Sequence, residues 1–310
     1  MIVTAREKEM TFYLLDKYGI KFINISSHKK NILSKLINYI FRWKKLYLLC
    51  RQEKPDASMG IGDFILPQIG WLLHFKSIVF TDIESVPHDS FLTFPFASVI
   101  ITPKSYKKKL GKKHVRLNSY KELSYINNYF VPKSSVLDEI GVKPSEKFIL
   151  VRFVSHSAVH DIGYCGITDK LKIKIVNGLK HHAKLFISSE ETLPEKLKKF
   201  RMNINPEKIH SVMFYAALLF GESSTMAAEA ALMGTPSIFI DKTGRGYTDE
   251  IAMESGLIHN FSLQNNGLKL SINKSIDIIR FDRKKRYSAI KKDDICEPII
   301  NIIVNHEIPA

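Results

Sequence analysis

One stretch of this chain, residues 219–240, has a local pattern that predicts a strand, a tight turn, a helix and a second strand in succession. The apolar run that leads into it, 216–220, is short enough for a buried strand, and Gly221 interrupts it where the chain must turn. A helix is predicted over 225–233 because Gly234 follows it as a stop signal. The stretch therefore predicts one repeating unit of an α/β fold.

The start of this predicted helix is lined with hydroxyl groups. Ser223 and Ser224 offer N-cap oxygens, and Thr225 follows them. Most of the helix consists of alanine, so its backbone can lie close to a sheet while the first main-chain N–H groups point outward. Unpaired N–H groups and the helix dipole favour an anion at this end.

Glu229 lies one turn beyond Thr225 on the same helix face, about 6 Å further along the axis. A carboxylate at this distance can accept hydrogen bonds from a vicinal diol, so a phosphate group at the helix start and a ribose at Glu229 describe a nucleoside diphosphate. The alternative is an ordinary capped helix with Glu229 as a solvated surface residue.

The run SSTMAAEAALMGTP at 223–236 resembles the donor-site signature of GT-B nucleotide-sugar enzymes, including UDP-N-acetylglucosamine 2-epimerase. The chain most resembles a prokaryotic family of uncharacterised, predicted GT-B glycosyltransferases related to that epimerase. Seven further stretches match in the same order and span nearly the whole chain: 2–6, 14–20, 77–84, 116–123, 152–155, 160–163 and 186–190.

The resemblance implies an α/β, GT-B-like fold in which two Rossmann-like domains with parallel sheets face a cleft. It implies a nucleotide-sugar donor, UDP-linked, and a saccharide or lipid-linked acceptor in polysaccharide or glycolipid synthesis. No cofactor and no metal are required by this scheme. The alternatives are a UDP-sugar 2-epimerase and a non-catalytic remnant that binds nucleotides or other anions. The chain departs from its relatives at Leu218, Glu222 and Ser224, which affects the expected phosphate geometry.

The composition of the 310 residues is that of a globular protein large enough for two domains, with 45% apolar and 25% charged residues. The sequence shows no membrane span, signal peptide, internal repeat or paired cysteine motif, so we expect a cytoplasmic protein with reduced thiols. The net charge of +15 calls for anionic partners. Nucleic acid is not expected, because the lysines cluster without a recognisable reading module.

The N-terminus predicts a strand at 1–4, a helix at 6–18 and a strand at 21–25. In the resembled family another strand and helix come first, so a unit on the order of 30 residues is expected to be missing here. The missing strand would be the central one of a doubly wound sheet, and its neighbours would lose their ladder partner.

Residues 28–54 combine many lysines and arginines with apolar residues at helical spacing. This pattern is typical of a basic amphipathic helix on an anionic membrane surface, which would suit a lipid-linked acceptor at the inner membrane. The alternative is a core-facing Rossmann helix with a solvated basic face.

Gly60 and Gly62 lie in a turn after a predicted strand, where they either let the backbone approach a ligand or permit the turn. Asp82 and Glu84 follow the next strand, at the sheet end where α/β proteins bind ligands. The resemblance places an acidic catalytic residue of the epimerase here, and its additional acid has no clear counterpart in 85–96.

Further along, Glu122 is either a ligand-contacting residue or an exposed glutamate at a helix start. His160 and Asp161 follow a strand predicted at 148–154 and match the resembled family, so His160 is a candidate acid toward a departing phosphate. A structural histidine held by Asp161 is the alternative. Ser189 lies in a strand-end turn predicted to line the nucleotide.

We therefore expect three parts. Residues 1–132 form an incomplete, acceptor-side Rossmann-like domain, 133–281 form the donor domain, and a terminal helix at 282–310 packs back toward the first domain. The candidate catalytic residues are Asp82, Glu84 and His160. The candidate substrate-binding residues are Gly60, Gly62, Asp161, Ser189, Ser223, Ser224, Thr225 and Glu229.

Overall fold

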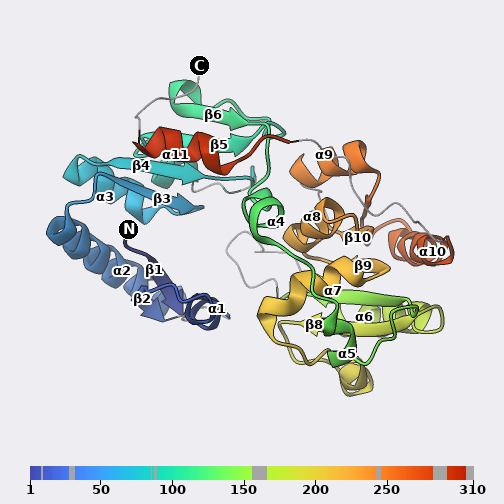
Figure 1. Ribbon diagram of the computed structural model, residues 1–310. Coiled ribbons are helices and arrows are strands. Elements are labelled where there is room, and N and C mark those ends of the chain that lie inside the picture. Colours follow the sequence, from blue (N-terminus) through green and yellow to red (C-terminus); the bar gives the residue numbers. More distant parts are fainter. Residues whose placement is uncertain are drawn as a thin grey trace. The chain divides into compact units, whose positions relative to one another are not determined.

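The computed structural model describes residues 1–7, 10–27, 32–84, 86, 89–155, 166–241, 246–281 and 292–304. The chain divides into two compact units (Figure 1). Unit 1 comprises Met1–Leu117 and Pro298–Ala310, and unit 2 comprises Asn118–Glu297. None of the described helices combines the length and the apolar character needed to cross a bilayer.

Unit 1 alternates strands and helices and contains only parallel strand pairs within its described part. Its elements are β1 (Thr4–Glu7), α1 (Thr11–Lys17), β2 (Ile23–Ser27), α2 (Ile32–Glu53), β3 (Ala57–Ile61), α3 (Ile65–Leu73), β4 (Lys76–Phe80), β5 (Val99–Pro103) and β6 (His114–Leu117). The helix α11 (Cys296–Val304) begins in unit 2 and continues into unit 1.

The strands of unit 1 form two sheets (Figure 1). β1 pairs with β2, and β3, β4, β5 and β6 form a four-stranded sheet in that order. No ladder joins either strand of the first sheet to the four-stranded sheet in the part of the chain described. As an edge strand, β3 leaves the apolar side chains of Met59 and Ile61 exposed.

Unit 2 is a five-stranded parallel sheet with helices on both faces. Its strands are β7 (Phe148–Phe153), β8 (Lys184–Ser189), β9 (Leu218–Gly221), β10 (Ser237–Ile240) and β11 (Ile258–Phe261), and its helices are α4 (Leu123–Tyr129), α5 (Ser135–Glu139), α6 (Asp169–Leu179), α7 (Ile209–Tyr215), α8 (Ser224–Leu232), α9 (Gly246–Ser255) and α10 (Gly267–Arg280).

Alternate side chains of β7 point to opposite faces of this sheet. Ile149 and Val151 pack with α6 and α10 on one face, whereas Phe148 and Leu150 pack with α5 and α7 on the other. Continuous apolar strands such as β7 are typical of parallel sheets covered on both sides.

The strand order β11-β10-β9-β7-β8 reverses direction between β7 and β9. β8 follows β7 on one side, while the chain crosses to β9 on the other. In open parallel sheets, the crevice for a ligand lies at the carboxyl ends of the two strands that flank this reversal. The fold therefore directs attention to the ends of β7 and β9.

The terminal helix expected at 282–310 is not continuous, as its described part shows. Helix α11 begins at Cys296, and residues 292–295 are not helical. The backbone of Asp293 is bound at two points, since its N–H donates to Asn118 O at 3.1 Å and its carbonyl accepts from Ser119 Oγ at 2.8 Å. These tertiary hydrogen bonds outweigh the helical periodicity of the segment.

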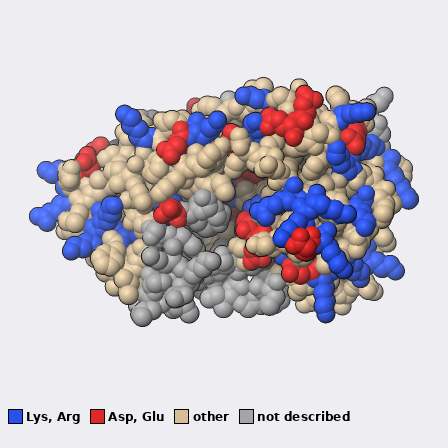
Figure 2. Space-filling model, turned by 90° about the horizontal axis from the view of Figure 1, so that it is seen from below, with Lys and Arg blue, Asp and Glu red and all other residues tan. Residues whose placement is uncertain are grey.

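Lys and Arg side chains are distributed in several groups on the face shown in Figure 2, with Asp and Glu side chains among them. The positive charge on this face is therefore not gathered into one continuous basic patch.

Cys50 and Cys296 are free thiols.

Candidate functional site

The turn between β9 and α8 begins at Gly221, opposite Arg152 of β7. A Cβ atom at Gly221 would lie 2.3 Å from the carbonyl oxygen of Arg152 and 3.0 Å from its Cβ atom. Only glycine fits here without moving the backbone of β7. The close approach joins the two strands at the point where the strand order reverses.

Helix α8 begins as the sequence predicts. Ser223 is its N-cap in an extended conformation, and its hydroxyl oxygen accepts a 3.3 Å hydrogen bond from the Met226 N–H. Ser223, Ser224 and Thr225 are all half-buried, so their hydroxyls border the exposed start of the helix. The following alanines, Ala227, Ala228, Ala230 and Ala231, are buried, as expected of a helix lying close to its sheet.

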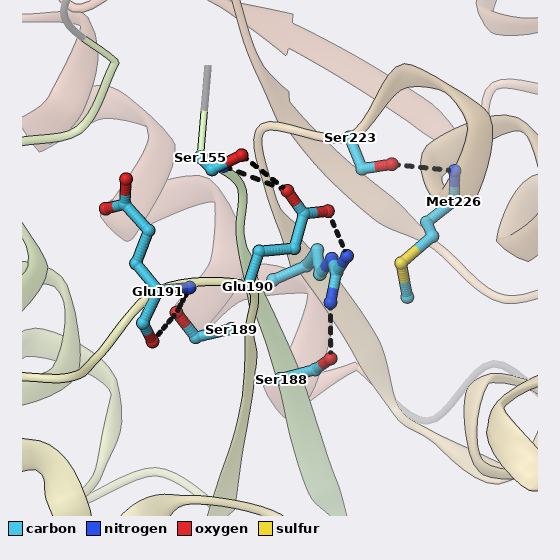
Figure 3. A network of polar contacts seen from close by, with 8 residues as sticks. Ser155, Ser188, Ser189, Glu190, Glu191, Ser223 and Met226 are labelled. Atoms are coloured by element: carbon cyan, nitrogen blue, oxygen red, sulfur yellow. Dashed lines mark hydrogen bonds and ion pairs between the residues drawn. The ribbon is translucent and has the colours of Figure 1, made fainter. Parts of the chain in front are cut away.

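A charged network lies beside this turn at the ends of β7 and β8 (Figure 3). The Arg152 guanidinium donates through Nη1 to Ser188 Oγ at 2.8 Å and through Nη2 to Glu190 Oε1. The other carboxylate oxygen of Glu190 accepts from the N–H of Ser155 at 3.0 Å and from its hydroxyl at 3.1 Å. The Arg152 and Glu190 side chains are 19% and 23% exposed, so solvent and a ligand can reach the pair.

The sequence motifs did not identify Arg152 as a site residue, although it is the first residue of the matching stretch 152–155. The available signal was a cation at the carboxyl end of an otherwise apolar strand, FILVRF. A guanidinium is suited to phosphate because it presents several N–H donors in one plane. Arg152 is therefore a cation, among the described residues at this edge of the sheet, that could neutralise a diphosphate.

Ser189 is the last residue of β8, next to the turn in which the sequence pattern predicts it. Its hydroxyl donates to Glu191 O at 3.0 Å and accepts from the Glu191 N–H at 3.2 Å (Figure 3). The side chain thus shapes the turn that carries Glu190. Its role as a nucleotide contact stays a prediction.

Glu222, one of the departures from the resembled signature, is buried. Its Oε1 atom accepts a 2.6 Å hydrogen bond from the N–H of Ile167. Ile167 and Gly166 are the first described residues after the loop that follows β7, so Glu222 fixes the end of that loop against the β9–α8 turn.

Glu229 is only 6% exposed, so the interpretation of this residue as a solvated surface glutamate is wrong. Its Oε1 atom accepts a 2.6 Å hydrogen bond from the hydroxyl of Tyr125 in α4 and lies 3.1 Å from Nε2 of His210 in α7. Burial, followed by the nearby Glu229 carboxylate, raises the pKa of Tyr125. Two helices distant in sequence therefore fix the orientation of this carboxylate.

Unit 1 carries the acidic candidates at the end of β4. Asp82 and Glu84 are half-buried, and Glu84 Oε1 accepts from the Lys107 N–H at 2.8 Å. Burial, with help from the carboxylates of Glu84 and Asp89, raises the pKa of Tyr106 to about 12. Asp82 and Glu84 remain candidates for a general base.

Asp89 is an acid that sequence reasoning passed over in residues 85–96. Its side chain is buried, and Oδ1 accepts a 3.0 Å hydrogen bond from Thr93 Oγ1 within the short π-helical turn Asp89–Thr93. Its negative charge, like that of Glu84, raises the pKa of Tyr106. Residues 85–96 therefore contain one buried acid in addition to Asp82 and Glu84, which precede them.

The structure explains why glycine occupies positions 60 and 62. A Cβ atom at Gly60 would lie 2.7 Å from the Cβ of Asp63, whose carboxylate accepts the N–H groups of Ile65 and Leu66 at the start of α3. Gly62 has a φ of +58°, a region that favours glycine. Contact of either glycine with a ligand stays a prediction.

Glu122 is buried and its carboxylate lies 3.0 Å from Lys121 Nζ, so the interpretation as an exposed glutamate is wrong. His160 and Asp161 lie outside the described residues, and so does the loop that contains them. Among the residues that are described, no group of three or more His, Cys, Asp or Glu side chains is arranged to hold a metal ion.

Comparison with known families gives a match over residues 1–307 to the family described as Protein of unknown function (DUF354). The chain belongs to the DUF354 family. This confirms the resemblance drawn from the sequence motifs. None of the curated proteins matches the DUF354 chain significantly in sequence.

Solved structures show the same fold as this DUF354 chain. The S. aureus MnaA–UDP co-structure has a TM-score of 0.71 at 16% identity, covering 100% of this chain and 90% of that one. The UDP-GlcNAc 2-epimerase from Methanocaldococcus jannaschii has a TM-score of 0.67 at 13% identity, covering 98% and 91%. The glycotransferase of kitacinnamycin has a TM-score of 0.54 at 9% identity, covering 90% and 83%. The fold is thus α/β and GT-B-like, with parallel sheets.

Proposed function

We propose that this protein binds a UDP-sugar in unit 2 and transfers the sugar to a saccharide or lipid-linked acceptor in polysaccharide or glycolipid biosynthesis. The observation that carries the proposal is the coincidence of three features at the reversal point of one sheet. Gly221 brings the β9–α8 turn against β7, Ser223 is the N-cap of helix α8, and Arg152 lies near the carboxyl end of β7.

In this proposal the diphosphate lies at the start of α8. The main-chain N–H groups, the hydroxyls of Ser224 and Thr225 and the Arg152 guanidinium would stabilise the negative charge that develops on the leaving UDP. Glu190 holds Arg152 in position before the ligand arrives. Ser189 would contribute from the end of β8. His160 and Asp161, which lie outside the described residues, keep the role toward the departing phosphate that the sequence predicts.

Glu229 would hold the ribose in the same proposal. Tyr125 and His210 both lie on Oε1, so Oε2 remains for the diol, and a carboxylate has room for about four hydrogen bonds in total. The two neighbours keep the carboxylate in one orientation. An oriented carboxylate loses less conformational entropy when it binds the diol.

The acceptor hydroxyl would lose its proton to a carboxylate of unit 1, Asp82 or Glu84, while the bond between the sugar and UDP breaks. Gly60 and Gly62 would line the acceptor. We place the protein in the cytoplasm, peripherally at an anionic inner membrane surface where a lipid-linked acceptor would be presented.

A titration calorimeter tests the first step. UDP and UDP-sugars should bind in the micromolar range or tighter, ADP and GDP more weakly, and Arg152→Gln should lower the affinity for UDP roughly tenfold. Lys184→Gln at the opposite end of β8 is the matched control and should leave the affinity unchanged. Absence of UDP binding, or equal effects of the two variants, would contradict the proposal.

A UDP-sugar 2-epimerase is the second candidate, and the buried Asp89 favours it because it adds an acid to Asp82 and Glu84 in the segment after β4. Incubation of the donor alone separates the two reactions. A new sugar formed without acceptor indicates epimerisation, whereas consumption of donor only with acceptor indicates transfer. UDP binding without either reaction indicates a non-catalytic nucleotide-binding protein.

A further inference from the structure

Helix α2 is apolar on two sides, and only one of them is packed. Leu46 and Cys50 are buried against Ile65 and Ile69 of α3. Tyr39, on the same helix, stacks on Phe64 with ring centroids 5.6 Å apart. This inner side confirms that α2 contributes to the core of unit 1.

The outer side of α2 leaves large apolar side chains in solvent. Ile37, Ile40, Phe41 and Leu48 are 47%, 60%, 67% and 51% exposed. Ile40, Phe41 and Leu48 follow Ile37 by three, four and eleven residues, so the four side chains lie on one face of the helix. The stripe that they form extends over about 17 Å at 1.5 Å per residue. Exposed apolar side chains in a stripe do not stabilise the folded chain, and such a surface marks a site of contact with a partner or a membrane.

Cations share this outer face. Lys44, Lys45 and Arg51 are exposed, and they fall between or beside the apolar side chains in the helical projection. Lys45 donates to the carbonyl of Asn24 at 2.7 Å. Within the described residues Lys44 and Arg51 form no ion pair or hydrogen bond. The remaining arginine, Arg42, is buried on the inner side.

We propose that the outer face of α2, defined by Ile37, Ile40, Phe41, Lys44, Leu48 and Arg51, docks on the surface of an anionic lipid bilayer. The apolar side chains would enter the boundary between headgroups and acyl chains, and the cations would contact lipid phosphates. Binding at this face is independent of the nucleotide site. Only its purpose, to bring unit 1 to a lipid-linked acceptor, rests on the proposed function.

The charge pattern favours a bilayer over a second copy of the chain. Lys44 is the midpoint of the face from Ile37 to Arg51, so a two-fold dimer through this face would bring Lys44 of one copy against Lys44 of the other. Like charges at the centre of a contact disfavour it. An anionic bilayer instead attracts the same lysine, in line with the net charge of +15.

Sedimentation with lipid vesicles tests this inference on the full chain. We expect binding to vesicles of phosphatidylcholine mixed with phosphatidylglycerol, weaker binding to phosphatidylcholine alone, and release by salt. The double variant Ile40→Ser with Phe41→Ser and the double variant Lys44→Gln with Arg51→Gln should each lower the partition coefficient roughly tenfold or more.

Matched controls come from unit 2, where exposed side chains of the same kinds occur on α10 and just beyond it. Leu270→Ser with Phe281→Ser controls the apolar pair, since these residues are 55% and 71% exposed. Lys269→Gln with Arg280→Gln controls the cationic pair. Both controls should bind vesicles like the unaltered chain, and circular dichroism should show that all four variants fold.

Three results would overturn the inference: no binding of the unaltered chain to anionic vesicles, unchanged binding of both α2 variants, or equal losses in the α10 controls. A dimer in sedimentation velocity that dissociates on Ile40→Ser with Phe41→Ser would assign the face to a second copy instead. If that variant does not fold, the Lys44→Gln with Arg51→Gln variant decides. Calorimetry with UDP on the α2 variants separates this inference from the proposed function, because their affinity for UDP should be unchanged.

Discussion

The hydroxyl of Tyr125 donates a 2.6 Å hydrogen bond to Oε1 of Glu229, a residue 104 positions further along the chain. This contact joins α4 to α8 within unit 2. The hydrogen bond holds the carboxylate of Glu229, which is buried on an alanine-rich helix, in one orientation. The proposed ribose site depends on that orientation.

Replacement of Tyr125 by Phe should destabilise unit 2. The variant keeps the ring but leaves Glu229 with one partner fewer, and loss of a hydrogen bond to a buried charged group costs about 1–3 kcal/mol. Urea unfolding monitored by circular dichroism measures the change. Tyr129→Phe, on the same helix but exposed, is the control and should lie within about 0.5 kcal/mol of the unaltered chain. Equal midpoints for the two variants would contradict the role given to Tyr125.

Replacement of Glu229 by Ala should weaken UDP binding roughly tenfold to a hundredfold, because two charge-assisted hydrogen bonds to a diol are lost. Glu222→Ala should affect affinity far less and instead lower the free energy of unfolding by about 1–3 kcal/mol, since the Ile167 N–H loses its acceptor. Calorimetry with UDP and a urea series on both variants provide the measurements. Similar losses of affinity in the two variants would disprove the assignment of Glu229 to the ribose.

Replacement of Gly221 by Ala should cost about 3 kcal/mol or more, because the added methyl group would overlap the Arg152 backbone and neither strand can move freely. Gly178→Ala in α6 is the matched control. There the nearest atom is Cγ2 of Ile272 at 2.9 Å, a side-chain atom instead of a backbone atom, and alanine favours the helix. Thermal unfolding should separate the two variants clearly, and a Gly221→Ala variant as stable as Gly178→Ala would refute the close-contact argument.

Unit 1 should lose stability in mild acid through His114. Its Nδ1 atom accepts the Leu110 N–H at 3.3 Å, so Nε2 carries the proton and donates to Thr102 Oγ1 at 2.8 Å. Burial, followed by the charge of Arg116, lowers the pKa of His114. The unfolded chain takes up the proton below about pH 6.5 while the folded chain resists it, so stability is full above that pH and falls below it.

The measurement is the urea midpoint at about pH 7.5 and about pH 5.5, on either side of the unfolded histidine pKa. His114→Gln should reduce the difference between the two midpoints. His181→Gln, which alters an exposed residue after α6, should leave it unchanged. If the two urea midpoints of the His114→Gln variant differ as much as those of the unaltered chain, another group causes the acid sensitivity.

The sequence alone determined the elements whose stabilising contacts are local. The N-cap at Ser223, the alanine run and the stop at Gly234, which has a φ of +85°, define α8 to within one residue of the predicted range. The hydrogen bonds of a cap and of a helix join residues at most four apart, so a short stretch contains all the information they need.

Elements whose limits depend on distant partners were predicted less well. The first strand was expected at residues 1–4 but lies at Thr4–Glu7, because its register is fixed by pairing with β2. A helix was expected from residue 282, but the described residues 292–295 are not helical, because the backbone of Asp293 is bound by Asn118 and Ser119. In each case the deciding contact comes from another part of the chain.

The candidate site divides in the same way. The sequence by itself determined that hydroxyls and a glutamate lie one turn apart on a helix that follows a buried strand. Only the tertiary structure decided that Arg152 and Glu190 pair beside that helix and that Tyr125 and His210 hold Glu229. Side-chain periodicity describes one element at a time, whereas the partner of a buried charge is chosen by how separate elements pack.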